Sequence, residues 1–523
     1  MSTVARIYAI IVLAFFPLWT GTIGYRNIIF DKALFFWIIS LVFYVVFAMF
    51  MLTHIIGLEK EDRNFKFWQS FKWFDWALVA LLIIATISCI ISPYQAIVWQ
   101  GYRNRNDGWF SYTIMFINYF ILSRFMRPNK SDLVWFAGGS ILVCIIGIFQ
   151  FHGLDLFNLF PYTSPPYADE LGNPFFSGYS ILYRSTLGNI DFVSTYASMT
   201  VVIFGIMFIR SKGLSKLLFL AASMFNFDLL ITGGAELGKV AILGAMVILI
   251  PFFLKSREEL GFSFILVSSW GVAYTLHHFI FSTVMKSWVE GSVTMHDYIV
   301  KLNYRSLPLH YVLLASFVAL AFGLVLVLFK QLKWPPVKTC VIAGIAIVAC
   351  AVGGAFFAIE ILGKHPTNDI IYQAREILHG NFSDDFGSNR LFIWRTAFEI
   401  HFNHFQLFGT GTDTFYYALG DRIQTAALMD IGTIFDKAHN DYIQILLCNG
   451  ILALAAYLAF VFGVGINSLK KALNNDLVFA CFGGFAAYLI QAFFGIDSIV
   501  VTPIFWLVVA LLRNYQLNHK TEN

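Results

Sequence analysis

Two residues in a polar stretch of the chain, Arg390 and His439, have side chains suited to chemistry on a phosphorylated substrate. Arginine donates two parallel hydrogen bonds to a phosphate and keeps its charge at neutral pH. Histidine titrates near neutral pH, so it can accept a proton from a hydroxyl group or donate one to a leaving group. Both lie within residues 364–441, which are far richer in charge than the apolar runs on either side. We therefore expect the chemistry of the protein in this stretch.

Arg390 follows Gly-Ser-Asn at 387–389, which is a plausible helix start. On such a helix Arg390, Trp394, Ala397 and His401 share one face. The helix is amphipathic, so it can lie along a membrane surface. The alternative role of an arginine at this place is that of an interfacial anchor, which reaches the lipid headgroups and takes no part in chemistry.

His439 stands before Asn440 and an apolar run, so it is expected at the mouth of a membrane-spanning helix. As a base it could be oriented by Asp436 or Asp441. The alternative is a histidine that only borders the helix. Gly409 and Gly411 lack the third glycine and the preceding strand of a nucleotide loop, so they indicate a turn.

Three further cations are weaker candidates for binding an anionic substrate, namely Arg105, Arg184 and Lys239. Each of them can equally be an interfacial anchor. His277, His278 and His296 have no partner at metal-ligand spacing, so the sequence predicts no metal site.

The composition is that of a membrane protein. Hydrophobic residues make up 58% of the 523 residues, and charged residues only 13%. A soluble domain carries about 25% charged residues. Fourteen apolar segments are long enough to cross a bilayer as helices. They lie near 5–23, 33–57, 73–92, 108–126, 133–151, 188–209, 215–233, 237–254, 260–283, 307–330, 338–361, 441–464, 476–494 and 498–515.

The predicted fold is an all-α polytopic membrane protein with about 12–14 transmembrane helices and a large extracytoplasmic loop that contains an amphipathic helix. We expect a helical bundle over 1–361, a catalytic loop over 362–440 and C-terminal transmembrane helices over 441–523. Sustained apolarity distinguishes these segments from barrel strands, which would alternate.

Basic residues predict the orientation. Alternate loops, beginning with the second, carry seventeen Lys and Arg, whereas the short loops of the other parity carry five. By the positive-inside rule the first set is cytoplasmic. The long loops at about 152–187, 284–306 and 362–440 then face outside the cytoplasm. Because ATP and nucleotide sugars are absent there, the substrate must bring its own energy, for instance as a lipid-linked diphosphate.

Together these segments resemble the O-antigen ligase and O-antigen polymerase superfamily. Its C-terminal signature is an arginine shortly before a tryptophan, then a Gly-x-Gly turn, then Ala-His-Asn before a helix with a glycine. The matching residues here are Arg390, Trp394, Gly409, Gly411, Ala438, His439, Asn440 and Gly450. Two upstream segments also fit, 101–108 as Gly-x-x-x-Arg-x-x-Gly and 187–189 as a Gly-Asn element before a helix. The resemblance covers about 95–465 and is specific in its C-terminal part.

The resemblance implies a multi-pass cell-membrane glycosyltransferase that acts outside the cytoplasm. Its donor would be an undecaprenyl-diphosphate-linked glycan, and its acceptor a glycan, lipid or protein. Arg390 and His439 would be catalytic, and Arg105, Arg184, Lys239, Trp394 and Asn440 would bind substrate. We expect no cofactor, no required metal and no nucleic-acid partner. Polymerase is slightly favoured over ligase, because a Phe-, Ile- and Asn-rich composition hints at a source without a lipopolysaccharide core.

One departure from the family concerns residues 232–235. Members often carry Ser-Arg-Gly at this point, whereas this chain has Thr-Gly-Gly-Ala. Lys239 or another outer cation would have to take the place of that arginine. A lysine would supply a point charge without the forked pair of hydrogen-bond donors of a guanidinium group. A transporter or flippase is the alternative from another class. It predicts internal repeats and polar residues at mid-membrane, and we see no convincing repeat.

Overall fold

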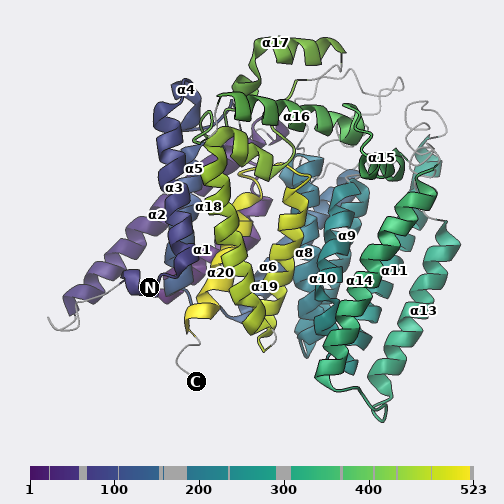
Figure 1. Ribbon diagram of the computed structural model, residues 1–523. Helices are drawn as coiled ribbons and strands as arrows, with labels where there is room; N and C mark the ends of the chain where they lie inside the picture. The colour runs from purple at the N-terminus through teal and green to yellow at the C-terminus, as the bar shows by residue number, and fades with distance from the viewer. Residues whose placement is uncertain are drawn as a thin grey trace.

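The computed structural model describes residues 1–22, 24–57, 67–103, 105–151, 157, 159, 185–233, 236–289, 308–364, 369–404, 407–430, 434–472 and 474–518. Throughout these residues the regular secondary structure is helical, without a strand. Figure 1 shows the long helices side by side in one bundle. The predicted fold class, an all-α polytopic membrane protein, is confirmed.

Each of the fourteen predicted segments coincides with a helical element. In chain order these are α1 (Ser2–Ile10) continued by η1 (Ile11–Phe15) and η2 (Phe16–Leu18), α2 (Ile28–Gly57), α3 (Trp73–Ile91), α5 (Trp109–Phe125), α6 (Lys130–Phe151), α8 (Ile190–Arg210), α9 (Leu214–Gly233), α10 (Glu236–Phe253), α11 (Arg257–Val289), α13 (Leu309–Leu328), α14 (Val337–Leu362), α18 (Asp441–Ala472), α19 (Asp476–Ala492) and α20 (Thr502–Asn518).

Within the described residues, nine helices are long and apolar enough to cross a membrane. Three shorter apolar helices, Ser2–Leu18, Leu237–Phe253 and Asp476–Ala492, accompany them. The last of these, like α5 and α20, runs for 17 residues. Because a bilayer core of about 30 Å calls for roughly 17 to 25 helical residues, these helices lie at the lower limit of a span.

The bundle has a packed interior and a lipid-facing rim. The apolar window of α8 is 100% buried, whereas the windows of α2, α13 and α14 are 22%, 17% and 11% buried. Phe317 on α13 illustrates the rim, since it is 69% exposed. Contact between water and an apolar surface of this size is unfavourable, so exposed apolar helices of this kind require surrounding lipid.

An ion cluster ties three helices together. Asp75 on α3 accepts from Arg513 of α20 at 2.6 Å and is paired with Arg124 of α5 at 3.0 Å. Tyr119 of α5 donates to the same carboxylate at 2.8 Å. All these side chains are buried, so each charged group is stabilised by its partners of opposite charge and would be costly without them.

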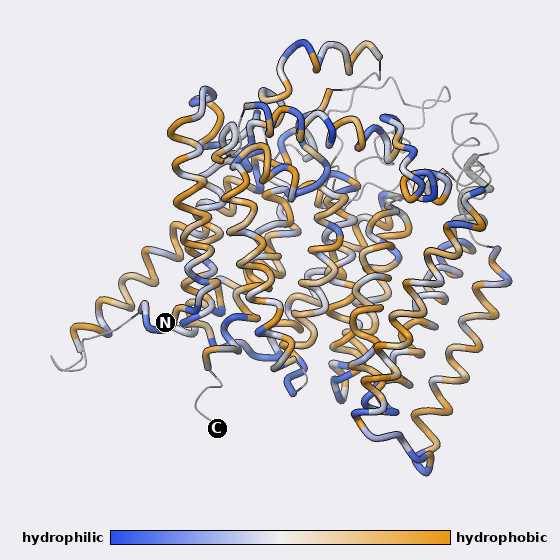
Figure 2. The backbone as a smooth tube through the Cα atoms, viewed as in Figure 1, coloured by the Kyte–Doolittle hydropathy of each residue, from blue (hydrophilic) through white to orange (hydrophobic). Residues whose placement is uncertain are grey.

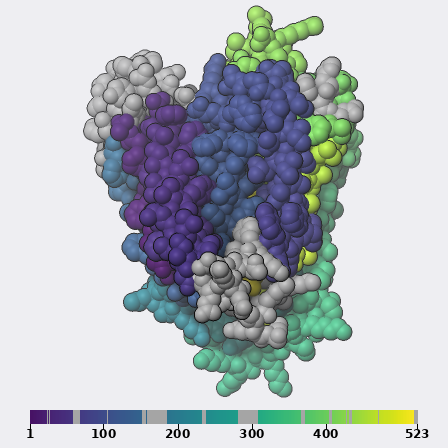
Figure 3. Space-filling model, turned by 90° about the vertical axis from the view of Figure 1, so that its left-hand side faces the viewer, coloured from purple at the N-terminus to yellow at the C-terminus, as the bar shows by residue number. Residues whose placement is uncertain are grey.

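Three amphipathic helices lie across one end of the bundle, which we call the loop side (Figure 1). They are α15 (Asp369–Leu378), α16 (Phe386–His404) and α17 (Phe415–Asp430). The hydrophilic residues in Figure 2 gather there and at the opposite end, with apolar helices between them. Both chain termini lie away from the loop side. Figure 3 views the face made by α2 to α5, above which α17 projects.

Candidate functional site

Arg390 is the first regular residue of the long part of α16. Gly387, Ser388 and Asn389 have φ values of 64°, 57° and 68°, so the helical path is interrupted until Arg390. The predicted face of this helix is turned toward the bundle, since Ala397 is 1% and His401 0% exposed. Phe398 and Phe402 point outward and are 40% and 52% exposed. Ala397 and His401, which the periodicity places on one face of this helix, are thus on its buried face.

The Gly-Thr-Gly turn is fitted against a break in α18. Gly450 has a φ of 86°, and the carbonyls of Leu447 and Cys448 just before it accept from Thr410 N at 3.1 Å and Gly411 N at 2.7 Å. A Cβ on Gly450 would lie 2.1 Å from the carbonyl oxygen of Leu407. Glycine is therefore required, because only it combines this left-handed conformation with so close an approach. This packing brings the turn back onto the bundle.

Short polar contacts fix the residues on both sides of His439. The Trp394 indole donates to the Ala438 carbonyl at 2.8 Å, and the Ala438 amide donates to Gln444 Oε1 at 3.0 Å. Asn440 Oδ1 accepts from the amides of Tyr442 and Ile443 at 3.0 and 3.1 Å, which caps the first turn of α18. The Trp394 indole and Asn440 Oδ1 thus hold the backbone on the two sides of His439. Their roles toward substrate stay predictions.

Arg390 and His439 share one electrostatic environment although they are 49 positions apart in the chain. Burial lowers the pKa of His439, and the charges of Arg390 and Arg105 lower it further, whereas Asp191 and Asp436 act in the opposite direction. Burial also lowers the pKa of Arg390, against the effect of Asp191. The neutral imidazole is consequently favoured at neutral pH, as a proton acceptor requires.

Two buried nitrogens at this place have no hydrogen-bond partner within the described structure. They are Nε of Arg390 and Nδ1 of His439. Both residues are partly exposed, so the site is mostly surrounded by protein but still has an opening. Buried polar atoms are nearly always paired in folded proteins. Two buried nitrogens without a partner in the same electrostatic environment therefore indicate a binding place for a polar ligand.

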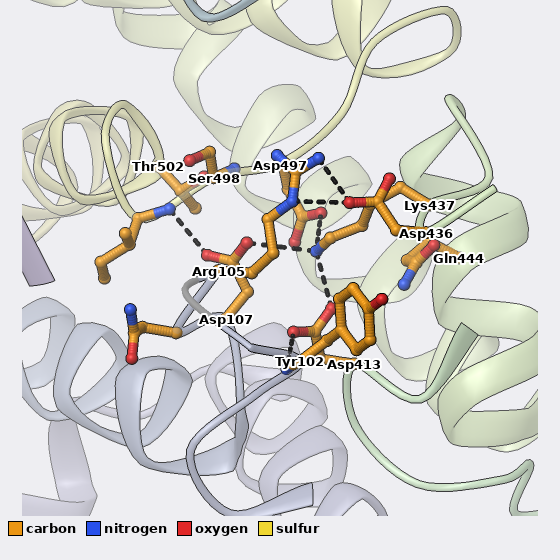
Figure 4. Close-up of polar contacts among 12 residues, drawn as sticks. Tyr102, Arg105, Asp107, Asp413, Asp436, Lys437, Gln444, Asp497, Ser498 and Thr502 are labelled. Atoms are coloured by element: carbon orange, nitrogen blue, oxygen red, sulfur yellow. Dashed lines mark hydrogen bonds and ion pairs between the residues drawn. The ribbon is translucent and has the colours of Figure 1, made fainter. Parts of the chain in front are cut away.

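Arg105 lies in the same environment but is already paired. Its Nε and Nη2 donate to Asp436 Oδ2 at 2.9 and 2.6 Å (Figure 4). Burial disfavours the charged form, yet the charge and hydrogen bonds of Asp436 outweigh it and raise the pKa of Arg105. Arg105 can therefore attract an anion only while sharing its charge with this carboxylate.

The other two predicted cations are placed differently. Arg184 lies outside the described residues, as do residues 234 and 235 of the segment that replaces Ser-Arg-Gly. Lys239 is in the first turns of α10, next to Gly238, whose position packs against Ser194 of α8.

Sequence reasoning missed Asp191 as a site residue. It is in the first turn of α8, where its amide donates a hydrogen bond to Asn189 Oδ1 at 2.8 Å. The Gly-Asn element at 188–189 marked the start of this helix, but nothing in the sequence indicated that the helix begins beside Arg390 and His439. That neighbourhood exists only because the chain folds back through α15 to α17.

A second missed group surrounds Lys437. Its Nζ lies 3.2 Å from Asp107, 3.0 Å from Asp413 and 3.1 Å from Asp497 (Figure 4). The Lys437 side chain is 2% exposed, and those of Asp107 and Asp413 3% and 1%. The position of Lys437 directly before Ala438 was visible in the sequence. The convergence of three acids from distant segments was not.

A cavity with about 790 Å³ of empty space, open solvent included, lies beneath this group. Its walls are mostly aromatic and aliphatic side chains of α3, α5, α18 and α20, with Lys437 and Asp441 among its polar lining. Arg390 and His439 do not line it. This cavity therefore belongs to the Lys437 side of the 437–441 segment and not to the Arg390–His439 environment.

As for metal ligands, the described part of the chain has no group of three His, Cys, Asp or Glu side chains arranged to hold an ion. Asp107, Asp413 and Asp497 converge on the Lys437 ammonium group instead. Chemically, the Arg390–His439 environment offers a fixed positive charge and a neutral imidazole at one enclosed place.

Comparison with protein families gives one match in the part of the chain that contains this site. Residues 312–458 match the family model described as O-antigen ligase. The matched segment begins in α13, includes α14 to α17 and ends in α18, so it contains both Arg390 and His439. A search of curated proteins gave no significant match. The chain is thus a multi-pass helical membrane protein in which residues 312–458 match an O-antigen ligase family model, and its predicted resemblance to the O-antigen ligase and polymerase superfamily is confirmed.

Proposed function

We propose that this protein transfers a glycan from a polyprenyl diphosphate, of the undecaprenyl type, to an acceptor hydroxyl on the outer face of the cytoplasmic membrane. The observation that carries the proposal is the shared environment of Arg390 and His439, in which Arg390 Nε and His439 Nδ1 are buried without a partner among the residues that the structure describes. The charge bias of the loops supports the outer placement, since it puts residues 362–440 outside the cytoplasm.

In the proposed reaction the acceptor oxygen attacks the anomeric carbon of the donor sugar. The bond from that carbon to the phosphate oxygen breaks, and the configuration at the carbon inverts. His439 accepts the proton of the hydroxyl group as the new bond forms. Arg390 stabilises the negative charge that grows on the departing lipid diphosphate. Because the guanidinium group supplies this charge, the proposed step requires no divalent cation.

Polymerisation is the first form of this proposal, with a second lipid-linked repeat as acceptor. Ligation to a lipid or protein acceptor uses the same chemistry at the donor. The two are separated by the glycans of a strain that lacks the gene. Single repeats still attached to the final acceptor support a polymerase, whereas long chains retained on the lipid carrier support a ligase.

The test uses purified protein in lipid vesicles with the undecaprenyl-diphosphate-linked repeat extracted from the producing cells. We expect glycosidic bond formation with or without a chelator. Arg390→Ala should lower the rate by about 100-fold or more, as expected for a key electrostatic donor. Arg395→Ala is the matched control, because Arg395 is on the same helix but its side chain is 58% exposed and pairs with Asp384.

Two results would overturn the proposal. One is an unchanged rate for either Arg390→Ala or His439→Ala at normal protein levels. The other is movement of the lipid-linked glycan across the bilayer without any new glycosidic bond, which would favour the transporter.

A further inference from the structure

The Lys437 ammonium group connects parts of the chain that are far apart in sequence. Asp107 precedes α5, Asp413 follows the Gly-Thr-Gly turn, and Asp497 joins α19 to α20. All three carboxylates reach Nζ within 3.2 Å (Figure 4). Without this cation the three acids would repel one another in a buried place, so their convergence depends on Lys437.

The same acids also hold main-chain groups. Asp107 Oδ1 accepts from the Ile499 amide at 2.7 Å, and Asp413 Oδ2 accepts from the Tyr102 amide at 2.7 Å. Asp441, at the start of α18, accepts from the Asp497 amide at 2.9 Å. The loops before α5, before α17, before α18 and before α20 are therefore fastened to one another around a single lysine.

His439 is two residues from Lys437 in a backbone conformation that an L-residue rarely adopts. Its φ is 49°, and that of Asp413 is 57°. Such conformations persist only where the surrounding contacts determine them. Here Lys437 is held by three acids and Ala438 by Trp394 and Gln444, while Nδ1 of His439 has no partner in the described part of the chain. The contacts fix the neighbours of His439 and leave its imidazole available.

We propose that Lys437 is a positioning residue, which holds Asp107, Asp413 and Asp497 together and so fixes the strained backbone that presents His439. This inference rests on the proposed function insofar as His439 acts on substrate. Lys437 itself does not contact the reacting groups, since it faces the cavity that neither Arg390 nor His439 lines.

The first measurement reports the position of His439 independently of catalysis. Purified full-length protein in nanodiscs is treated with diethyl pyrocarbonate, and the modification rate of each histidine is followed by mass spectrometry. In Lys437→Met we expect faster modification of His439, because the segment relaxes and the buried Nδ1 becomes accessible. The exposed His310 on α13 is the internal reference and should not change.

The second measurement is glycan formation from the undecaprenyl-diphosphate-linked repeat by the same preparations. For Lys437→Met we expect a loss of about 10- to 100-fold, because a displacement of roughly 1 Å at a reacting group costs up to that much. Lys437→Arg keeps the charge and should restore part of both readouts. Lys32→Met is the matched control for loss of a buried lysine, since Lys32 donates to the carbonyls of Phe16 and Pro17 on another part of the bundle.

Should Lys437→Met fail to fold, Asp413→Asn decides, because it keeps an acceptor for the Tyr102 amide while it removes one charge from the group. Faster modification of His439 with reduced glycan formation is the expected result for either variant. An unchanged modification rate of His439 in a folded variant overturns the inference, whatever the activity. Full activity of His439→Ala would instead overturn the proposed function and leave the positioning role standing.

Discussion

Replacing Trp394 with phenylalanine tests the link between α16 and the segment that carries His439. The change keeps an aromatic ring but removes the indole N–H that donates to the Ala438 carbonyl at 2.8 Å. Ala438 is 0% exposed, so its carbonyl would lose this partner away from water. A buried acceptor left without its partner costs about 1–3 kcal/mol, and interhelical hydrogen bonds in membrane proteins average about 0.6 kcal/mol. We therefore expect a loss of about 1–2 kcal/mol.

This loss has two measurable consequences. The free energy of unfolding in mild denaturant should fall by that amount. Glycan formation should fall about 5- to 30-fold if the free energy serves to place His439, since one or two kcal/mol corresponds to such a factor. The assay compares both quantities in nanodiscs for Trp394→Phe and for Trp135→Phe, a control at a side chain that is 55% exposed. Equal stability and equal activity of Trp394→Phe and the parent protein would refute the positional role of this bond.

Three more predictions follow from the site. Burial lowers the pKa of His439, so the rate of glycan formation should fall only as pH drops below the ordinary value of about 6.5; a pH–rate profile with its acidic limb above that value contradicts the assignment. Asp497 Oδ1 lies 3.1 Å from Lys437 Nζ in a buried place, so its charge stabilises the fold through this ion pair. Thermal unfolding of Asp497→Asn should therefore occur at a lower temperature than that of the parent protein, and an unchanged unfolding temperature would contradict this. Asn440→Ala removes the cap of α18 and should cost about 1 kcal/mol in unfolding experiments, and the loss should disappear in Asn440→Asp, which still caps.

The fold was predictable because each span carries its own signal. Helix-length apolar runs locate the helices one at a time, and each of the fourteen runs coincides with a helical element. The burial of individual spans was not predictable in this way, since α8 and α13 are both strongly apolar but one is central and the other lipid-facing. That difference depends on which helices pack together, and a helix that is apolar on all sides does not reveal its neighbours.

Those parts of the candidate site that depend on a single local segment were predictable. Arg390 and the start of α16, the turn at Gly409 and the helix start after His439 all follow from local residue types. The acids around Lys437 and the place of Asp191 were not predictable, because they depend on contacts over as many as 392 positions, such as that between Asp107 and the Ile499 amide. The contacts of Trp394 and Asn440 with the backbone were not predicted either, namely those of the Trp394 indole with Ala438 and of Asn440 Oδ1 with Ile443. Their contact with substrate stays a prediction.

The most direct test of the central claim is a single-turnover measurement with purified protein, undecaprenyl-diphosphate-linked repeat and excess acceptor. The parent protein and Arg395→Ala should form a glycosidic bond and release undecaprenyl diphosphate in equal amounts. Arg390→Ala and His439→Ala should bring both products to a small fraction of that amount, with the fold intact by size-exclusion chromatography. Normal release of undecaprenyl diphosphate by either variant, with its bond formed, would contradict the account.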